Sequence, residues 1–178
     1  FGDEYSFTIE AWYKNYSTNT GANDGYDDGS NIFASYKRSG GGDPYNNFTL
    51  QMIPENHGDV PGSFNIIGAS SETAYDDGIW HHVAGTVESI NQEYTIIKLY
   101  VDGELKSTNQ FDEWDFTSSS NNFYINNHSP FAGDHMQDCY VAGISLTNGI
   151  KYNQDFNPEY PLLNNENTLI NLDFSNDS

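Results

Sequence analysis

Residues 77–87 read DGIWHHVAGTV, and this stretch decides the fold. Its second half alternates with period two, because one side of the chain carries Val83, Gly85 and Val87 while polar or small residues lie between them. A period of two predicts a β-strand with one buried face, and the Asp-Gly pair in front is a turn signal. The stretch therefore predicts a turn that leads into a strand.

The next strands follow directly along the chain. Residues 96–106 read IIKLYVDGELK, in which Asp102-Gly103 separates a β-branched and aromatic run from a second short run. An Asp-Gly pair between two such runs predicts a β-hairpin with a two-residue turn. The centre of the chain is therefore predicted to be antiparallel β-structure.

Short runs of strand-like sequence recur outside this centre, and no window shows a helical stripe. The further predicted strands are 5–13, 48–52, 64–67, 123–125, 140–146 and 169–174. Many short strands separated by turn signals are typical of a β-sandwich or barrel. With neither an internal repeat nor a linker, residues 1–178 are predicted to form one all-β domain.

The charge balance excludes several kinds of partner. The chain has 26 Asp plus Glu against 6 Lys plus Arg, a formal net charge of −20. Proteins that bind duplex nucleic acid need a basic footprint, so we expect no nucleic-acid partner. The same charge argues against anionic membranes and sulfated polysaccharides. No run approaches the roughly 20 apolar residues of a membrane-spanning helix, so we expect no membrane insertion.

Cysteine use and aromatic content limit the remaining classes. Cys139 is the only cysteine, which excludes an intramolecular disulfide and a thiolate zinc cluster. Aromatic residues make up 15% of the chain and charged residues 18%, which excludes a disordered chain. The aromatic side chains are sufficient to build a core.

Five segments resemble laminin-G-like, concanavalin A-like jelly-roll domains, in the order that this family has them. Residues 7–12 read FTIEAW, 77–86 read DGIWHHVAGT and 99–105 read LYVDGEL. Residues 144–152, followed by 155–158, are similar to the tail of one bacterial and phage branch of the family. Residues 168–174 resemble the strand that returns beside the N-terminus. The resemblance implies a two-sheet antiparallel jelly-roll β-sandwich. It also implies an extracellular or surface-exposed module that binds carbohydrate or protein, with calcium in many members.

Two departures from the family pattern matter. The family has one or two strands before the FTIEAW segment, whereas here the chain begins six residues before Phe7. The first strands are then either missing or replaced by the C-terminal strand. Two acidic residues of the family fall on Ala142 and Gly143, so no role of those carboxylates carries over.

The sequence predicts that the domain is not an enzyme. Glycoside hydrolases of this superfamily carry two catalytic carboxylates on one strand, which need to lie close together to act as acid and nucleophile. The nearest match is Glu113 with Asp115, but Thr117 and Ser118 occupy the two positions where the second Glu would stand. Glycan cleavage therefore ranks third among the functions considered.

Calcium is the metal that the sequence favours, because calcium prefers six to eight oxygen ligands. Asp24, Asp27 and Asp28 lie in a Gly-rich segment, and Asp134 and Asp138 form a second cluster. The alternative for both is a solvated acidic loop. His81 and His82 point to opposite faces of a strand and cannot chelate one ion. We expect one ring to be packed and hydrogen-bonded and the other to lie at the surface.

Sugar binding needs aromatic platforms beside amide and carboxylate groups. The candidate is the segment after the predicted hairpin, where aromatic and acidic residues alternate. The predicted ligand-binding residues are Asp112, Glu113, Trp114, Asp115, Tyr45 and Asn127. The alternative for the Trp is packing under a long loop.

These observations predict a non-catalytic extracellular recognition or adhesion module that binds a neutral glycan or a protein surface, with calcium fixing its loops. The alternative is a structural module of a surface fibre, filament or virion that makes protein–protein contacts. In that alternative, the partner is a second copy or a neighbouring module that adds a strand.

Overall fold

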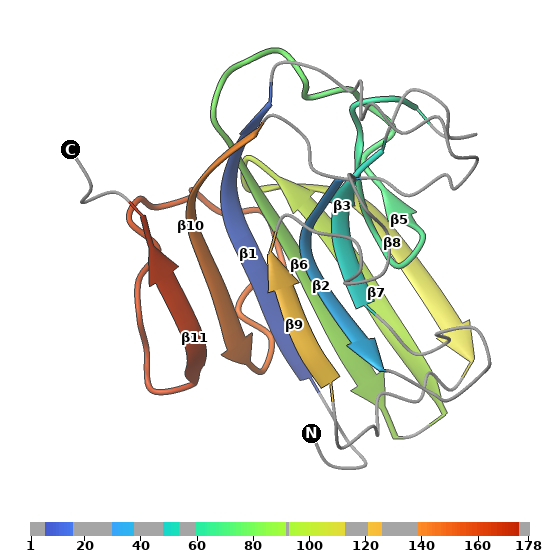
Figure 1. Ribbon diagram of the computed structural model, residues 1–178. Coiled ribbons are helices and arrows are strands. Elements are labelled where there is room, and N and C mark those ends of the chain that lie inside the picture. The colour runs from blue at the N-terminus through green and yellow to red at the C-terminus, as the bar shows by residue number, and fades with distance from the viewer. Residues whose placement is uncertain are drawn as a thin grey trace.

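The computed structural model describes residues 6–15, 30–37, 48–53, 60–91, 93–112, 121–125 and 139–174. These residues form eleven β-strands and contain no helix. The strands make two antiparallel sheets that lie face to face (Figure 1). The predicted two-sheet jelly-roll β-sandwich is confirmed.

Sheet A has six strands and carries the sequence motifs that point to the fold. Its order is β11 (Thr168–Asp173), β10 (Cys139–Asn148), β1 (Ser6–Asn15), β6 (His81–Ile90), β7 (Tyr94–Val101) and β8 (Glu104–Asp112). The C-terminal strand β11 lies at the edge and pairs with β10. Because β10 lies between β11 and β1, the expectation that the last strand returns directly beside the N-terminal strand is wrong by one strand.

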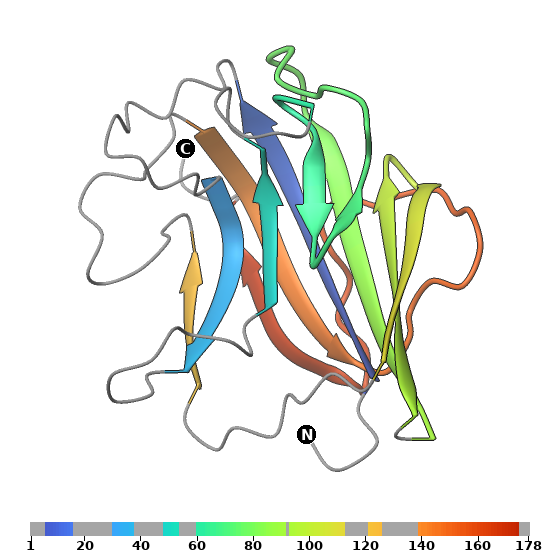
Figure 2. The ribbon, with the colours of Figure 1, turned by 90° about the vertical axis from the view of Figure 1, so that its right-hand side faces the viewer.

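Sheet B has five strands and covers one face of sheet A (Figure 2). Its order is β5 (Ala69–Ser70), β4 (Phe64–Ile66), β3 (Phe48–Met52), β2 (Ser30–Lys37) and β9 (Asn121–Ile125). Strands β4 and β5 form a hairpin whose turn residues Ile67 and Gly68 both have positive φ. This hairpin is the edge of the sheet on the side of β8.

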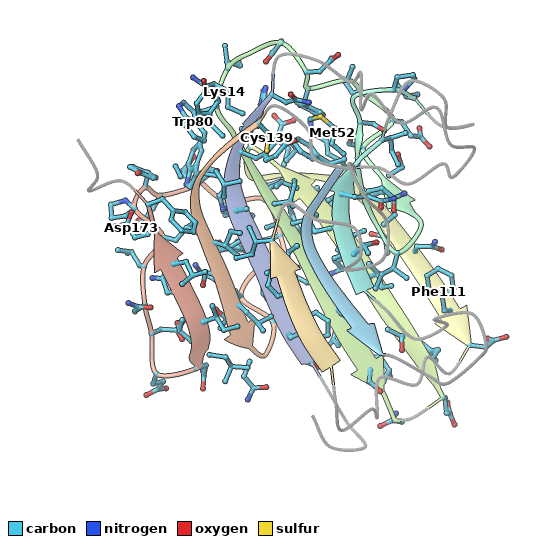
Figure 3. The ribbon with its side chains drawn as sticks, viewed as in Figure 1. Lys14, Met52, Trp80, Phe111, Cys139 and Asp173 are labelled. Atoms are coloured by element: carbon cyan, nitrogen blue, oxygen red, sulfur yellow. The ribbon has the colours of Figure 1, made fainter. Side chains whose placement is uncertain are left out.

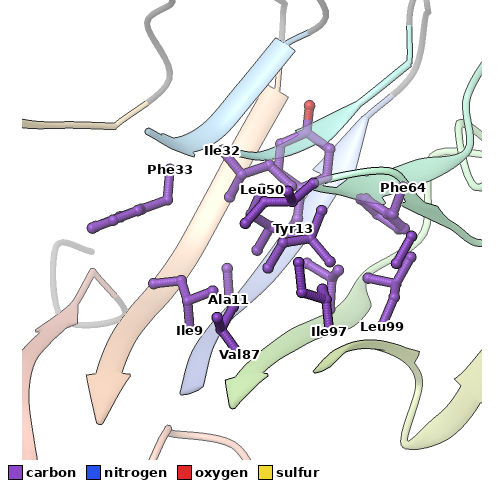
Figure 4. Close-up of a cluster of buried hydrophobic side chains, with 14 of the residues drawn as sticks. Ile9, Ala11, Tyr13, Ile32, Phe33, Leu50, Phe64, Val87, Ile97 and Leu99 are labelled. Atoms are coloured by element: carbon purple, nitrogen blue, oxygen red, sulfur yellow. The ribbon is translucent and has the colours of Figure 1, made fainter. Parts of the chain in front are cut away.

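The core lies between the sheets and is built by period-two alternation. On β1, Phe7, Ile9, Ala11 and Tyr13 all point inward and are buried. Side chains from β6, β7 and β10 extend this layer, and side chains from sheet B meet it (Figure 4). Burying each large apolar side chain stabilises the fold by roughly 1.5–3 kcal/mol.

The predicted two-residue hairpin turn is confirmed. Val101 pairs with Glu104, and Asp102 and Gly103 have φ values of 53° and 81°. Two positive φ values are typical of a type I′ turn, which Asp-Gly favours. A Cβ atom on Gly103 would lie 1.9 Å from the carbonyl oxygen of Phe156, so the turn also needs glycine for a close backbone contact.

Candidate functional site

The outer face of sheet A is covered by the segment that follows β10. We call residues 149–163 the cover segment. Thr8 Oγ1 donates to the Gly149 carbonyl oxygen and accepts from the Lys151 amide, both at 2.9 Å. Farther along, the Phe156 amide donates to the Gly103 carbonyl at 2.9 Å. The cover segment is therefore held at both β1 and the β7–β8 turn.

A buried carboxylate fastens the cover segment to the sheet. Glu10 points outward from β1 and is fully buried beneath the segment. Lys151 Nζ and Tyr152 OH donate to its two oxygens at 2.6 Å each, and His82 Nε2 lies 3.2 Å from Oε2. Burial alone would raise the Glu10 pKa, but the hydrogen bonds from His82, Lys151 and Tyr152 outweigh it and lower the pKa.

Aromatic rings fill the space around this carboxylate. Tyr152 and Phe156 stack in parallel, with their centroids 3.5 Å apart, and both rings meet the edge of His82. Burial first, and then the Glu10 charge, raises the pKa of Tyr152, so its hydroxyl stays a donor. Glu10 is buried and hydrogen-bonded through both carboxylate oxygens, so this cluster fastens the cover segment to the sheet.

An open aromatic hollow lies where the cover segment ends. It has a volume of about 320 Å³ and is lined by Trp12, Trp80, Ala142 and Tyr160. Trp80 is 41% exposed and Tyr160 is 49% exposed. We call these four residues the aromatic hollow. Its volume is at the lower end of the range of small-molecule pockets, so it holds about one ring-sized group.

Each wall of the hollow is positioned by a different part of the fold. Trp12 alternates outward on β1, and its Nε1 donates to the Glu159 carbonyl oxygen at 3.0 Å. The ring of Tyr160 meets that of Trp12 edge to face at 6.0 Å. Ala142 forms part of the wall because β10 has a β-bulge there: Trp12 pairs with Gly143, and the next pair skips Ala142.

Trp80 is held from two sides. Lys14 Nζ lies 5.2 Å from the Trp80 ring and 5.1 Å from the Tyr140 ring, which are cation–π distances. Figure 3 shows Lys14 and Trp80 side by side at one end of β1. The residue after Trp80 is His81, whose side chain is held by hydrogen bonds of its own. These hydrogen bonds fix the backbone that carries the indole.

His81 lies between two carboxylates. Its Nδ1 is 2.7 Å from Asp102 Oδ2, and its Nε2 is 3.1 Å from Asp77 Oδ1. Burial alone would lower the His81 pKa, but these two partners outweigh it and raise the pKa. Both His81 and His82 are buried and hydrogen-bonded. The expectation that one ring lies at the surface is wrong, because the cover segment buries the outer face as well.

Of the predicted ligand-binding residues, the structure describes one. Asp112 is exposed at the end of β8, after Phe111. Glu113, Trp114, Asp115, Tyr45 and Asn127 lie outside the described residues. The same holds for the predicted calcium ligands Asp24, Asp27, Asp28, Asp134 and Asp138. Among the residues that are described, no group of three or more His, Cys, Asp or Glu side chains is placed to hold a metal ion.

Sequence reasoning missed the aromatic hollow. Trp12 and Trp80 both lie inside motifs that indicate strands and turns, and Tyr160 lies in a segment without a periodic pattern. Trp12 did carry one signal, because it alternates with the core residues of β1 and must point outward. No local pattern indicates that residues 12, 80, 142 and 160 meet.

Comparison with known proteins identifies the family. The family model of the concanavalin A-like lectin/glucanases superfamily (Laminin_G_3) matches residues 1–145. The chain belongs to this superfamily. The match ends within β10, so the family segment includes Trp12, Trp80 and Ala142 but not the cover segment.

Two further comparisons add little. No curated protein matches the chain. Among solved structures, the chain is similar to the crystal structure of the marine PL-14 alginate lyase from Aplysia kurodai, at 12% identity and a TM-score of 0.36. That alignment covers 83% of this chain and 69% of the lyase. In the part of the chain that is described, no helix is long and apolar enough to cross a membrane.

Proposed function

We propose that this superfamily domain is a non-catalytic extracellular recognition module that binds a neutral glycan through the aromatic hollow. The observation that carries the proposal is the set of three aromatic rings around an apolar hollow, two of them substantially exposed. The faces of sugar rings carry C–H groups that pack on aromatic rings, while hydroxyl groups at the ring edges remain in water. A neutral sugar also avoids repulsion from a chain with a net charge of −20.

The non-catalytic part of the proposal is supported by where the described carboxylates lie. Glu10 is buried and hydrogen-bonded through both oxygens, and none of the described carboxylates lines the aromatic hollow. Glycoside hydrolysis needs two carboxylates at the scissile bond. A reducing-end assay on β-glucan tests this part, and sustained turnover would contradict it.

Binding is tested on an array of neutral glycans, with and without a chelator. The Trp80→Ala variant removes one wall of the hollow, and Ala142→Leu fills it while all three rings remain. Both should weaken binding at least tenfold, because the first removes an exposed ring and the second occupies the space in which the sugar would pack. The matched control is Ile79→Ala, since Ile79 is exposed beside Trp80 but does not line the hollow. Binding that survives both hollow variants would refute this site.

Calcium assistance is part of the proposal and has its own test. A site that is formed only in the folded state raises the melting temperature as the ion is added, by an amount equivalent to about 2.7 kcal/mol at one hundred times Kd. We expect such a rise with calcium chloride and its reversal by a chelator. An unchanged melting temperature would remove calcium from the proposal.

A structural role is the second candidate, and one observation favours it. The edge strand β11 and its surroundings expose large apolar side chains. They are Leu163, Leu169, Leu172 and Phe174. Apolar side chains gathered at a sheet edge are typical of a protein contact or of strand addition. Light scattering tests this role, and a monomer at high protein concentration would count against self-association.

A further inference from the structure

A second hollow lies at the edge of sheet B, between the β4–β5 hairpin and β8. Its volume is about 920 Å³. Its lining includes the Val60-Pro61 pair, Asn65, Ser70 and Glu72, with Ser107 from β8 across the opening. We call this hollow the polar cleft. It is large enough for several linked ring-sized groups, whereas the aromatic hollow holds about one.

Asn65 is the most informative residue of the polar cleft. It is only 7% exposed, and its Oδ1 accepts a hydrogen bond from the Gly68 amide at 3.2 Å. Its Nδ2 donates to no acceptor within the described part of the chain. Although most of the side chain is buried, the Nδ2 atom itself remains accessible, and Asn65 lines the cleft. Asn65 therefore offers a fixed donor to whatever enters the cleft.

The other polar groups of the cleft complement this donor. Ser107 Oγ makes no hydrogen bond to any described residue, so it is available as both donor and acceptor. Ser70 Oγ accepts from the Glu72 amide at 3.3 Å. Glu72 has a φ of 53°, and its carboxylate forms no ion pair with a described residue. The cleft thus presents a donor, hydroxyl groups and an anionic acceptor around one space.

We propose that the polar cleft is a second binding site, which takes the hydroxyl groups of a neutral oligosaccharide chain. A hydroxyl group both accepts and donates, so one sugar can accept from Asn65 Nδ2 while it donates to the Glu72 carboxylate. Val60 and Pro61 offer an apolar wall to the face of a sugar ring. The inference rests on the proposed function for its ligand class, but not for its location.

Other ligand classes fit the cleft less well. A cationic group would satisfy Glu72, but it has no acceptor to offer to Asn65 Nδ2. Glu72 is also exposed, so its attraction for a cation is screened by salt. An extended peptide offers carbonyl acceptors at a fixed spacing but no hydroxyl groups. A neutral peptide is therefore the competing ligand in the test.

The experiment is calorimetric titration with cellotetraose, laminaritetraose, mannotetraose and a capped tetraglycine peptide, which has no hydroxyl groups. The variants are Ser107→Ala and Glu72→Asn, because asparagine tolerates the positive φ at position 72. The matched controls are Thr108→Ala, which neighbours Ser107 on the opposite face of β8, and Glu93→Asn, an exposed acid outside the cleft. The Asn65 side-chain amide is followed in parallel by NMR.

We expect at least one tetrasaccharide to shift the Asn65 amide resonance and to bind about three- to tenfold more weakly to each cleft variant. The control variants should leave this binding unchanged. Tetrasaccharide binding that is lost in Trp80→Ala but intact in both cleft variants would overturn the cleft and leave the proposed function standing. A response of the Asn65 amide to the peptide alone would overturn the ligand class. No sugar binding by the unmodified chain would overturn both proposals.

Discussion

The two faces of β1 are buried by different means. On the inner face, Phe7 and Ile9 pack against apolar side chains of the core between the two sheets. On the outer face, Thr8 and Glu10 are buried by hydrogen bonds to the cover segment. Apolar burial depends on area and tolerates changes of shape, whereas a buried polar group needs each of its partners in place. One strand therefore carries both a tolerant face and an exacting one.

The outer face of sheet A also carries the aromatic hollow, which is open to solvent. Near the end of the cover segment, Trp12 donates a hydrogen bond to Glu159 and lines the aromatic hollow together with Trp80 and Tyr160. The same hydrogen-bonded segment that buries Glu10 therefore sets the position of one wall of the hollow. Changes on the outer face should affect both stability and binding, while changes on the inner face should affect stability alone.

The largest effect is expected from Glu10→Ala. It leaves the donors of His82, Lys151 and Tyr152 without their acceptor, at a cost of about 3 kcal/mol in the free energy of unfolding. On the inner face, Ile9→Val should cost only about 0.5–1.5 kcal/mol. Urea unfolding followed by circular dichroism measures both. Equal losses at positions 9 and 10 would break the distinction between the two faces.

The next largest effect is expected from Gly103→Ala. A Cβ atom there would lie 1.9 Å from the backbone oxygen of Phe156, and the φ of 81° disfavours any other residue. Either the turn or the cover segment must move, at a cost of roughly 1–3 kcal/mol. Gly149→Ala is the control, because it has a positive φ of 91° but no atom within 4 Å of the added Cβ. A milder effect at position 103 than at 149 would contradict the close contact.

The pH dependence separates Glu10 from His81. Folding lowers the pKa of Glu10. The contribution of Glu10 to stability is therefore complete above a pH of about 4.3, and it is lost as the pH falls through the folded pKa. Folding raises the pKa of His81. The contribution of His81 to stability is therefore complete below a pH of about 6.5, and it is lost as the pH rises through the folded pKa. Unfolding of the unmodified chain and of His81→Asn across this range measures the difference. A gap between them that widens above neutral pH would contradict the assignment for His81.

The smallest effect on stability is expected from Trp80→Ala. The indole is 41% exposed, and its loss removes the contact with the Lys14 ammonium, worth about 0.5–1 kcal/mol. Thermal unfolding measures the change, and we expect a shift of a few degrees at most. A loss as large as that of Glu10→Ala would mean that Trp80 belongs to the buried structure and not to an open hollow.

The fold was predictable because its signals are local. Alternation along β6 and β7 and the Asp-Gly turn at 102–103 need no distant partner to be recognised. The site was not predictable, because the residues that form it are far apart in the sequence. Glu10 and Lys151 are separated by 141 positions, and nothing in either neighbourhood specifies the other. The predicted ligand-binding loop around Trp114 and the calcium ligands stay predictions, since they lie outside the described residues.

The buried contact between Glu10 and Lys151 also bears on where this unit can be cut. The family match ends at residue 145, six positions before the ammonium group that neutralises Glu10. A chain shortened to that boundary would keep the family motifs that precede residue 145. It would nevertheless lose the cover segment, and the Glu10 carboxylate would be left without its counter-ion. A protein cut at the family boundary should therefore fold less stably than one that ends beyond β11, because only the longer chain retains the counter-ion.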